Sequence, residues 1–102
     1  MVEVNWTDQA IDDISNIAKF IAKDSEKYAA IQTESFFERA QILEKIPFVG
    51  RIVPESNNKL IRELILGNYR LIYFIVDKNR IDIITIHHGS MLLENSPAFK
   101  KK

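Results

Sequence analysis

The segment IRELILGNYRLIYFIV, residues 61–76, places charged side chains inside a run of large apolar residues. Glu63 and Arg70 lie in this segment, and His87 lies in the next apolar segment of the chain. A carboxylate, a guanidinium and an imidazole that converge on an apolar surface can select a partner protein or an RNA by charge, while the apolar residues supply affinity. This chemistry requires that the three side chains share one surface.

Two turns determine whether these side chains meet. Gly67-Asn68 is typical of a two-residue hairpin turn, and residues 77–80 predict a four-residue turn between the next two strands. Because side chains alternate along a strand, these turns place Arg70 directly opposite His87 and Glu63 diagonal to Arg70, about 7–8 Å away. The pairs that define this register are Leu66 with Tyr69, Ile65 with Arg70, Glu63 with Ile72, Arg62 with Tyr73, and Val76 with Ile81.

The predicted register also divides the side chains between two faces of the sheet. The first face carries Glu63, Arg70, Thr85 and His87 among Ile61, Ile65, Ile72, Phe74, Ile81 and Ile83. We expect the helices to leave this face uncovered, and an open apolar face is an aggregation liability unless a partner binds it. The predicted partner-binding residues are Ile61, Glu63, Arg70, Ile72, Phe74 and His87. The structural alternative is that Glu63 and Arg70 form an ion pair near the sheet edge and that His87 is a polar residue at a strand end.

The opposite face would pack against the helices. Its residues include Arg62, Ile84, Ile86 and His88. Arg62 needs a carboxylate there or a route to the sheet edge, and Asp12 or Asp13 is the predicted partner. His87 and His88 are adjacent and so point to opposite faces, which prevents them from ligating one metal ion. We predict no metal site and no cofactor.

The remaining sequence predicts the elements that support this sheet. Residues 2–6 alternate apolar and polar side chains and predict a short strand, and Thr7 is a favourable N-cap for the helix that follows. A second helix begins at Asp24 or Ser25 and ends at Pro47, and so short a connection makes the two helices antiparallel. The segment PFVGRIVPESNN then predicts a loop. The order β-α-α-β-β-β predicts an α+β fold in which a mainly antiparallel sheet packs on a helical hairpin.

The length and composition of the chain fit one globular domain over residues 1–102, with a flexible tail at residues 92–102. The chain has no cysteine and no long apolar run, which favours a cytoplasmic protein that does not contact a membrane. Residues 1–46 hold five Lys/Arg against nine Asp/Glu, whereas residues 47–102 hold nine against five. This asymmetry could steer an acidic partner to the second half, but a formal net charge of zero argues against a general nucleic-acid binder.

Five short motifs extend across the predicted elements. They are W-T-x-x-A-x-x-D at residues 6–13, P-x-x-G-R-x-V-P-E at 47–55, I-R-E-L at 61–64, Y-R-L-I-Y at 69–73 and H-H-G at 87–89. Together they resemble the ParE/RelE superfamily, the toxins of bacterial type II toxin–antitoxin modules, over roughly residues 2–93. The motifs at 47–55 and 61–64 are more similar to the ParE, or plasmid-stabilisation, branch.

The resemblance implies a toxin with the fold predicted above and a cognate antitoxin, ParD-like or RelB-like, whose C-terminal segment wraps around it. For the ParE branch it implies inhibition of DNA gyrase, in which the C-terminal segment, here residues 91–102, is implicated. RelE-type toxins cleave mRNA in the ribosome and have basic residues where this chain has Ile61 and Glu63, so this departure favours the ParE branch. A homologue that only binds an antitoxin is a third interpretation.

A nuclease subgroup of the superfamily, similar to YoeB, provides the main alternative. Its members work with Glu, Arg and His. Carried over to this chain, Glu55 or Glu63 would act as the base, Arg70 would bind the phosphate, and His87 would act as the acid. This alternative implies a ribosome-dependent mRNA endoribonuclease, whereas the ParE interpretation implies a toxin that acts by binding its target.

Overall fold

The structure, a computed structural model, describes residues 1–89 of the 102-residue chain. Its elements are β1 (Glu3–Trp6), α1 (Asp8–Ala22), α2 (Glu26–Ala40), the 3₁₀ turn η1 (Gln41–Glu44), β2 (Arg51–Ile52), β3 (Ile61–Leu66), β4 (Tyr69–Asp77) and β5 (Arg80–His88). The strands form one sheet in the order β1-β5-β4-β3-β2, in which β1 runs parallel to β5 and the other neighbours are antiparallel.

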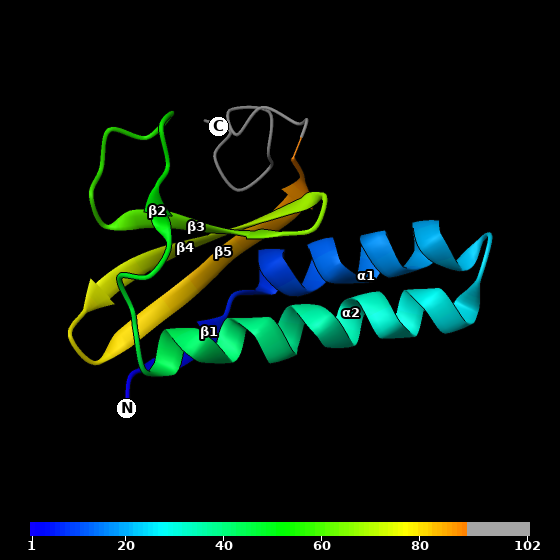
Figure 1. Ribbon diagram of the computed structural model, residues 1–102, viewed down its shortest axis with the longest axis horizontal. Helices are drawn as coiled ribbons and strands as arrows, with labels where there is room; N and C mark the ends of the chain where they lie inside the picture. The colour runs from blue at the N-terminus through cyan, green and yellow to red at the C-terminus, as the bar shows by residue number, and fades with distance from the viewer. Residues whose placement is uncertain (90–102) are drawn as a thin grey trace.

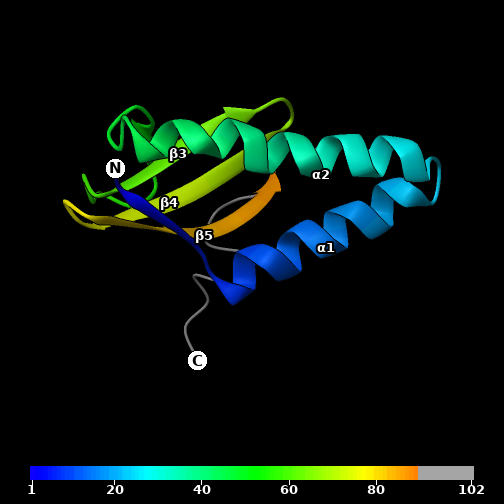
Figure 2. The ribbon, with the colours of Figure 1, turned by 90° about the horizontal axis from the view of Figure 1, so that it is seen from below.

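The α1–α2 hairpin lies on one face of this sheet (Figure 1, Figure 2). The predicted α+β fold and element order are confirmed, and β2 is a short edge strand inside the segment that the sequence predicts to be a loop. Within residues 1–89, no helix is both long enough and apolar enough to span a bilayer. The predicted tail at residues 92–102 lies outside the described residues.

Side-chain caps fix where both helices begin. Thr7 accepts a hydrogen bond from the Ala10 N–H at 3.2 Å, and Ser25 accepts one from the Tyr28 N–H at 3.1 Å. These bonds satisfy backbone donors that the first helical turn leaves unpaired. The second helix ends earlier than its predicted end at Pro47, because the α-helical geometry tightens into η1 before that residue.

The main core lies between the helical hairpin and the sheet. Its buried residues are Ala10, Ile14, Phe36, Ala40, Leu43, Leu66, Leu71, Tyr73, Ile75, Ile81, Ile83 and Ile86. Each large apolar side chain buried in this way contributes about 1.5–3 kcal/mol. The stability of the sheet therefore depends on its contact with both helices.

A smaller apolar cluster lies on the other face of the sheet. Val53 and Ile72 are fully buried there, and Ile61 and Ile84 pack against them. Val53 follows β2 in the segment that leads to β3, so this segment covers part of the face that the sequence predicts to be open. That prediction is wrong for the centre of the face, because the chain itself shields Ile72 from water.

The register of β3 on β4 is as predicted from the Gly67-Asn68 turn. Gly67 has a φ of +67°, which glycine adopts without steric strain and which matches a tight hairpin turn. Arg70 faces His87 across β4 and β5, which confirms the predicted pair. The two residues of this pair therefore share the face that also carries Glu63.

The turn between β4 and β5 differs from the prediction. It holds two residues rather than four, so Ile81 faces Ile75 instead of Val76. Register shifts leave Val76 as an extra residue of β4 and Ile84 as an extra residue of β5. Because the two bulges cancel, the register beyond them is as predicted. Between the bulges, the faces are exchanged: Ile81 and Ile83 join the helix-side core, and Ile84 joins the smaller cluster.

Candidate functional site

The site is built on the loop of residues 47–58, which carries β2. Tyr73 of β4 ties this loop to the sheet. The buried Tyr73 hydroxyl donates to the Pro47 carbonyl at 2.8 Å and accepts from the Gly50 N–H at 2.9 Å. A Cβ atom on Gly50 would lie 2.6 Å from both the Glu63 carbonyl and the Tyr73 hydroxyl, so only glycine fits. Burial raises the pKa of Tyr73, which keeps the phenol protonated for its donor bond.

Arg62 of β3 ties the same loop from a second position. Its Nη1 donates to the Phe48 carbonyl at 3.2 Å and to the Gly50 carbonyl at 3.0 Å, and its Nε donates to the Lys59 carbonyl at 3.0 Å. The guanidinium also lies over the Phe48 ring, 4.8 Å from its centre. Arg62 therefore reaches the sheet edge and finds backbone oxygens there.

The predicted pairing of Arg62 with Asp12 or Asp13 is wrong. Asp13 of α1 instead accepts hydrogen bonds from the Thr85 hydroxyl and from the Ile86 N–H, the latter at 3.2 Å. These contacts lie beyond the end of β1, where β5 has lost its parallel neighbour. Asp13 therefore accepts hydrogen bonds from polar groups at the edge of β5 and does not pair with Arg62.

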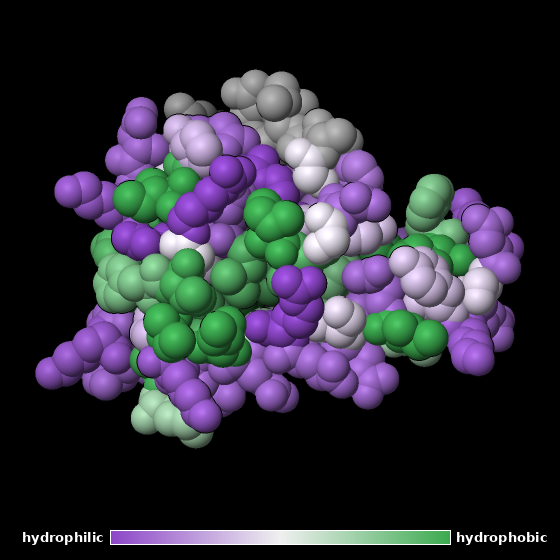
Figure 3. Space-filling view, in the orientation of Figure 1, coloured by the Kyte–Doolittle hydropathy of each residue, from purple (hydrophilic) through white to green (hydrophobic). Residues whose placement is uncertain are grey.

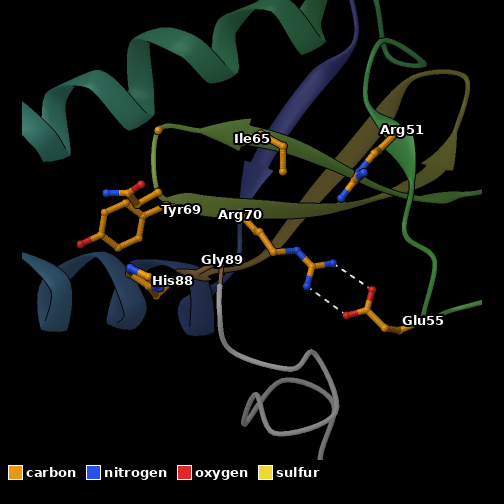
Figure 4. A pocket seen from close by; sticks show the side chains of 9 residues that line it. Arg51, Glu55, Ile65, Tyr69, Arg70, His88 and Gly89 are labelled. Atoms are coloured by element: carbon orange, nitrogen blue, oxygen red, sulfur yellow. Dashed lines mark hydrogen bonds and ion pairs between the residues drawn. The ribbon is translucent and has the colours of Figure 1, made fainter.

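Four charged side chains form a continuous chain between the loop and the sheet. Glu63 of β3, whose side chain is fully buried, accepts from Nε of Arg51 and, at 2.6 Å, from Nε of Arg70. Arg70 then donates from Nη1 and Nη2 to the two carboxylate oxygens of Glu55, each at 3.0 Å (Figure 4). Two cations and two anions balance, so the buried charge is compensated.

This arrangement sets the chemical state of its members. The Glu55 hydrogen bond, together with Glu63, raises the pKa of Arg70, so the guanidinium stays charged. All three guanidinium nitrogens of Arg70 already donate to carboxylates. Glu63 is held between the guanidinium groups of Arg51 and Arg70. The network is suited to fixing the 47–58 loop on β3 and β4.

His87 lies beside this network but outside it. It is 6% exposed, and neither Nδ1 nor Nε2 has a hydrogen-bond partner among the described residues. Burial, followed by the positive charge of Arg70, lowers the pKa of His87, so the ring is neutral near pH 7. The imidazolium form, which is the stronger proton donor, is therefore the minor form of His87 at that pH.

An open hollow of about 370 Å³ adjoins the network (Figure 4). It is lined by Arg51, Glu55, Ile65, Gly67, Asn68, Tyr69, Arg70, His88 and Gly89. Charged groups of the network thus reach solvent at one wall, whereas Glu63 remains behind it. Within the described part of the chain, no three His, Asp or Glu side chains are grouped as metal ligands.

The structure brings Glu55, Glu63, Arg70 and His87 together, but it does not expose them as a binding face. Of the predicted partner-binding residues, Glu63, Arg70, Ile72 and His87 are buried, and Ile61 and Phe74 are half-buried. The prediction that this set forms an open surface is therefore wrong. Burial by the 47–58 loop is the physical reason.

Sequence reasoning missed four residues that hold the site together. They are Gly50, Arg51, Val53 and Tyr73. A signal was present in the P-x-x-G-R-x-V-P-E motif, because its Pro, Gly, Arg, Val and Glu all contact the sheet. The contacts of this motif run to both I-R-E-L and Y-R-L-I-Y, so pairing the three motifs would have predicted these residues.

Comparisons with known proteins give the following matches. Residues 4–93 match the family model described as ParE toxin of type II toxin-antitoxin system, parDE. Among solved structures, the chain is similar to one from the chromosomal ParDE TA system of P. aeruginosa, with 21% sequence identity and a TM-score of 0.71. The likeness in fold covers 86% of this chain and 96% of that chain. No curated protein sequence matches the chain.

Proposed function

Because this chain belongs to the ParE toxin family of type II toxin–antitoxin systems, we propose that it arrests bacterial growth by inhibiting DNA gyrase. In this proposal a cognate, ParD-like antitoxin binds the toxin and neutralises it. The toxin acts by occupying a protein target, without a chemical step of its own. Its target and its antitoxin are both cytoplasmic, so the toxin acts in the cytoplasm.

The observation that supports target binding over RNA cleavage is the use of the candidate nuclease groups within the fold. RNA cleavage needs a base, a cation for the phosphate and a protonated acid. Here Glu63 is held by two arginines, Arg70 donates all its guanidinium nitrogens to carboxylates, and burial lowers the pKa of His87. A site in this state favours a structural role for these groups.

A supercoiling assay with purified DNA gyrase tests the proposal. We expect the toxin to leave relaxed plasmid relaxed, and we expect premixing with an equimolar amount of the antitoxin encoded beside it to restore supercoiling. The antitoxin alone is the control and leaves gyrase activity unchanged. Normal supercoiling at a large molar excess of toxin would count against gyrase as the target.

One observation favours the alternative, a ribosome-dependent mRNA endoribonuclease. Arg70 and His87 are direct cross-strand neighbours, and Glu55 contacts the same guanidinium. The partners would then be the ribosome and its mRNA. Mapping mRNA ends after expression of the wild type and of His87→Ala separates the two functions: new ends that require His87 support the nuclease, and identical ends in both remove His87 from catalysis.

A further inference from the structure

A patch of exposed apolar side chains lies beside the outer edge of β3. Its members are Ile42, Ile46, Phe48, Val49 and Ile65, each between 42% and 56% exposed. Figure 3 shows apolar side chains gathered over this part of the molecule, between the end of α2 and the outer strands. Contiguous exposed apolar surface on a small domain marks an interaction site. These five residues are named the β3-edge patch.

The β3-edge patch contains both a hollow and an uncovered strand edge. The hollow, about 210 Å³, is lined by Arg39, Ile42, Val49, Leu64, Ile65 and Leu66. β2 pairs with only two residues of β3, so within residues 1–89 no strand covers the edge at residues 64–66. An apolar groove beside such an edge accepts an extended or helical segment of another protein.

Basic side chains lie on the segments that carry and border the patch. They are Arg39, Lys45, Lys59 and Arg62. Arg39 reaches the Ile65 carbonyl at 3.5 Å, and Arg62 lies over Phe48. Among the described residues, no carboxylate forms an ion pair with any of these four cations. Their charge is therefore available to a partner.

Carboxylates do not balance this rim. In the segments that carry the patch and its rim, Glu63 is buried and already paired. Glu44 is half-buried and lines a separate hollow with Val4 and Trp6. Glu55 of the 47–58 loop is paired with Arg70, and Glu38 is an exposed carboxylate near the end of α2. The surface is thus apolar at its centre and basic around it, which complements an acidic, amphipathic segment.

We propose that the antitoxin docks an apolar segment flanked by carboxylates on the β3-edge patch. This inference rests on the proposed function and adds the surface and the chemistry of the segment that covers it. Apolar side chains of the antitoxin fill the hollow beside Val49 and Ile65, and its carboxylates pair with the basic rim. A second copy of the chain fits less well, because it would bring two basic rims together. A lipid surface offers no side chain to fill the hollow.

Titration calorimetry with the antitoxin encoded beside the toxin tests this surface. The double variant Val49→Asp/Ile65→Asp should raise the dissociation constant by about tenfold or more, as expected when central apolar contacts are replaced by charge. The double variant Arg39→Glu/Lys45→Glu changes exposed residues only. It should raise the dissociation constant about fivefold at low salt and by a smaller factor at high salt, where the ion pairs are screened. Thermal unfolding of each variant confirms that it is folded.

Two matched variants serve as controls. Ile31→Asp places the same charge at an exposed isoleucine of α2, and Lys27→Glu reverses an exposed lysine of the same helix. Both should bind the antitoxin within about twofold of the wild type. Equal losses in patch and control variants would overturn the assignment, because they would show a general effect of charge.

Other outcomes separate the inference from the proposed function. If the wild type binds the antitoxin and the patch variants bind equally well, the inference fails and the proposed function stands. If the wild type does not bind the antitoxin, the proposed function fails with it. The inference is also overturned if patch substitutions dissociate a wild-type dimer, abolish binding to anionic vesicles, or remove gyrase inhibition while antitoxin affinity is unchanged.

Discussion

Single side chains of the motifs each make several contacts between the 47–58 loop and the sheet. Tyr73 bonds two backbone groups of the loop, Arg62 bonds two carbonyls of the loop and the carbonyl of Lys59, and Glu63 joins two arginines. The nearness of Glu63 to Arg70 follows from the hairpin turn and was predictable from sequence. The partners of Arg62 were not predictable, because they are backbone carbonyls, which every residue has and which the sequence therefore does not distinguish.

Tyr73→Phe should destabilise the protein by about 1–3 kcal/mol, because it leaves the buried Gly50 N–H without its acceptor and the Pro47 carbonyl without its donor. Urea unfolding measures this free energy. Tyr28→Phe is the matched control, since its exposed hydroxyl has one long contact at 3.5 Å, and it should change stability by less than about 0.5 kcal/mol. Equal stability of Tyr73→Phe and the wild type would contradict the role of this hydroxyl.

His87→Leu should reduce the loss of stability at acid pH. Burial and Arg70 lower the pKa of His87 in the folded chain, against weaker opposing effects of Asp13, Glu55 and Glu63. As the pH falls below about 6.5, the unfolded chain therefore takes up this proton first, and up to about 1.4 kcal/mol is lost per pH unit. Above that pH the effect is absent. Urea unfolding between pH 8 and pH 5 measures it, and parallel curves for variant and wild type would refute it.

At the scale of elements, turn chemistry and periodicity predicted most of the sheet. Gly67-Asn68 fixed the β3–β4 register, and Thr7 and Ser25 began the helices as expected. The bulges at Val76 and Ile84 were not predictable, because each adds one residue to a strand that is apolar on both sides. The missed bulges placed Ile81 and Ile83 on the wrong face of the predicted sheet. β2 was missed because a strand of two residues is too short to show an alternating pattern.

Gly50→Ala should destabilise the 47–58 loop by about 1–3 kcal/mol, because the new methyl would overlap the Glu63 carbonyl and the Tyr73 hydroxyl. Gly67→Asn is the matched control. Nothing lies within 4 Å of a Cβ at Gly67, and asparagine tolerates its positive φ, so the cost there should be smaller. Chemical unfolding compares the two variants. A Gly50→Ala protein as stable as the wild type would show that the loop has room to move.

At the scale of the whole molecule, one sheet carries two different surfaces. The helical hairpin covers one face completely enough to form the main core, and the 47–58 loop covers the centre of the other. The β3-edge patch is then the apolar surface that the fold leaves beside the outer strands. The sequence predicts that a partner covers an open apolar face of the sheet. The 47–58 loop covers the centre of that face, and the exposed apolar surface lies at the edge of β3 instead.

Antitoxin binding should raise the midpoint of thermal unfolding of the toxin. A ligand that binds the folded chain alone stabilises it by about 2.7 kcal/mol at a concentration one hundred times its dissociation constant. Differential scanning calorimetry with increasing antitoxin measures the shift. The Val49→Asp/Ile65→Asp variant should show a smaller shift at the same antitoxin concentration. An unchanged midpoint for the wild type would contradict a complex with the folded toxin.

The central claim is that Glu63 and Arg70 hold the 47–58 loop on the sheet. A double-mutant cycle of Glu63→Gln and Arg70→Met, followed by urea unfolding, tests it most directly. We predict a loss of about 1–3 kcal/mol in each single variant, because each removes one buried, charged hydrogen bond while Arg70 keeps Glu55, or Glu63 keeps Arg51, as a partner, and a double variant that loses clearly less than the sum. Single variants as stable as the wild type or more stable, as expected for polar groups kept for activity, would contradict the claim.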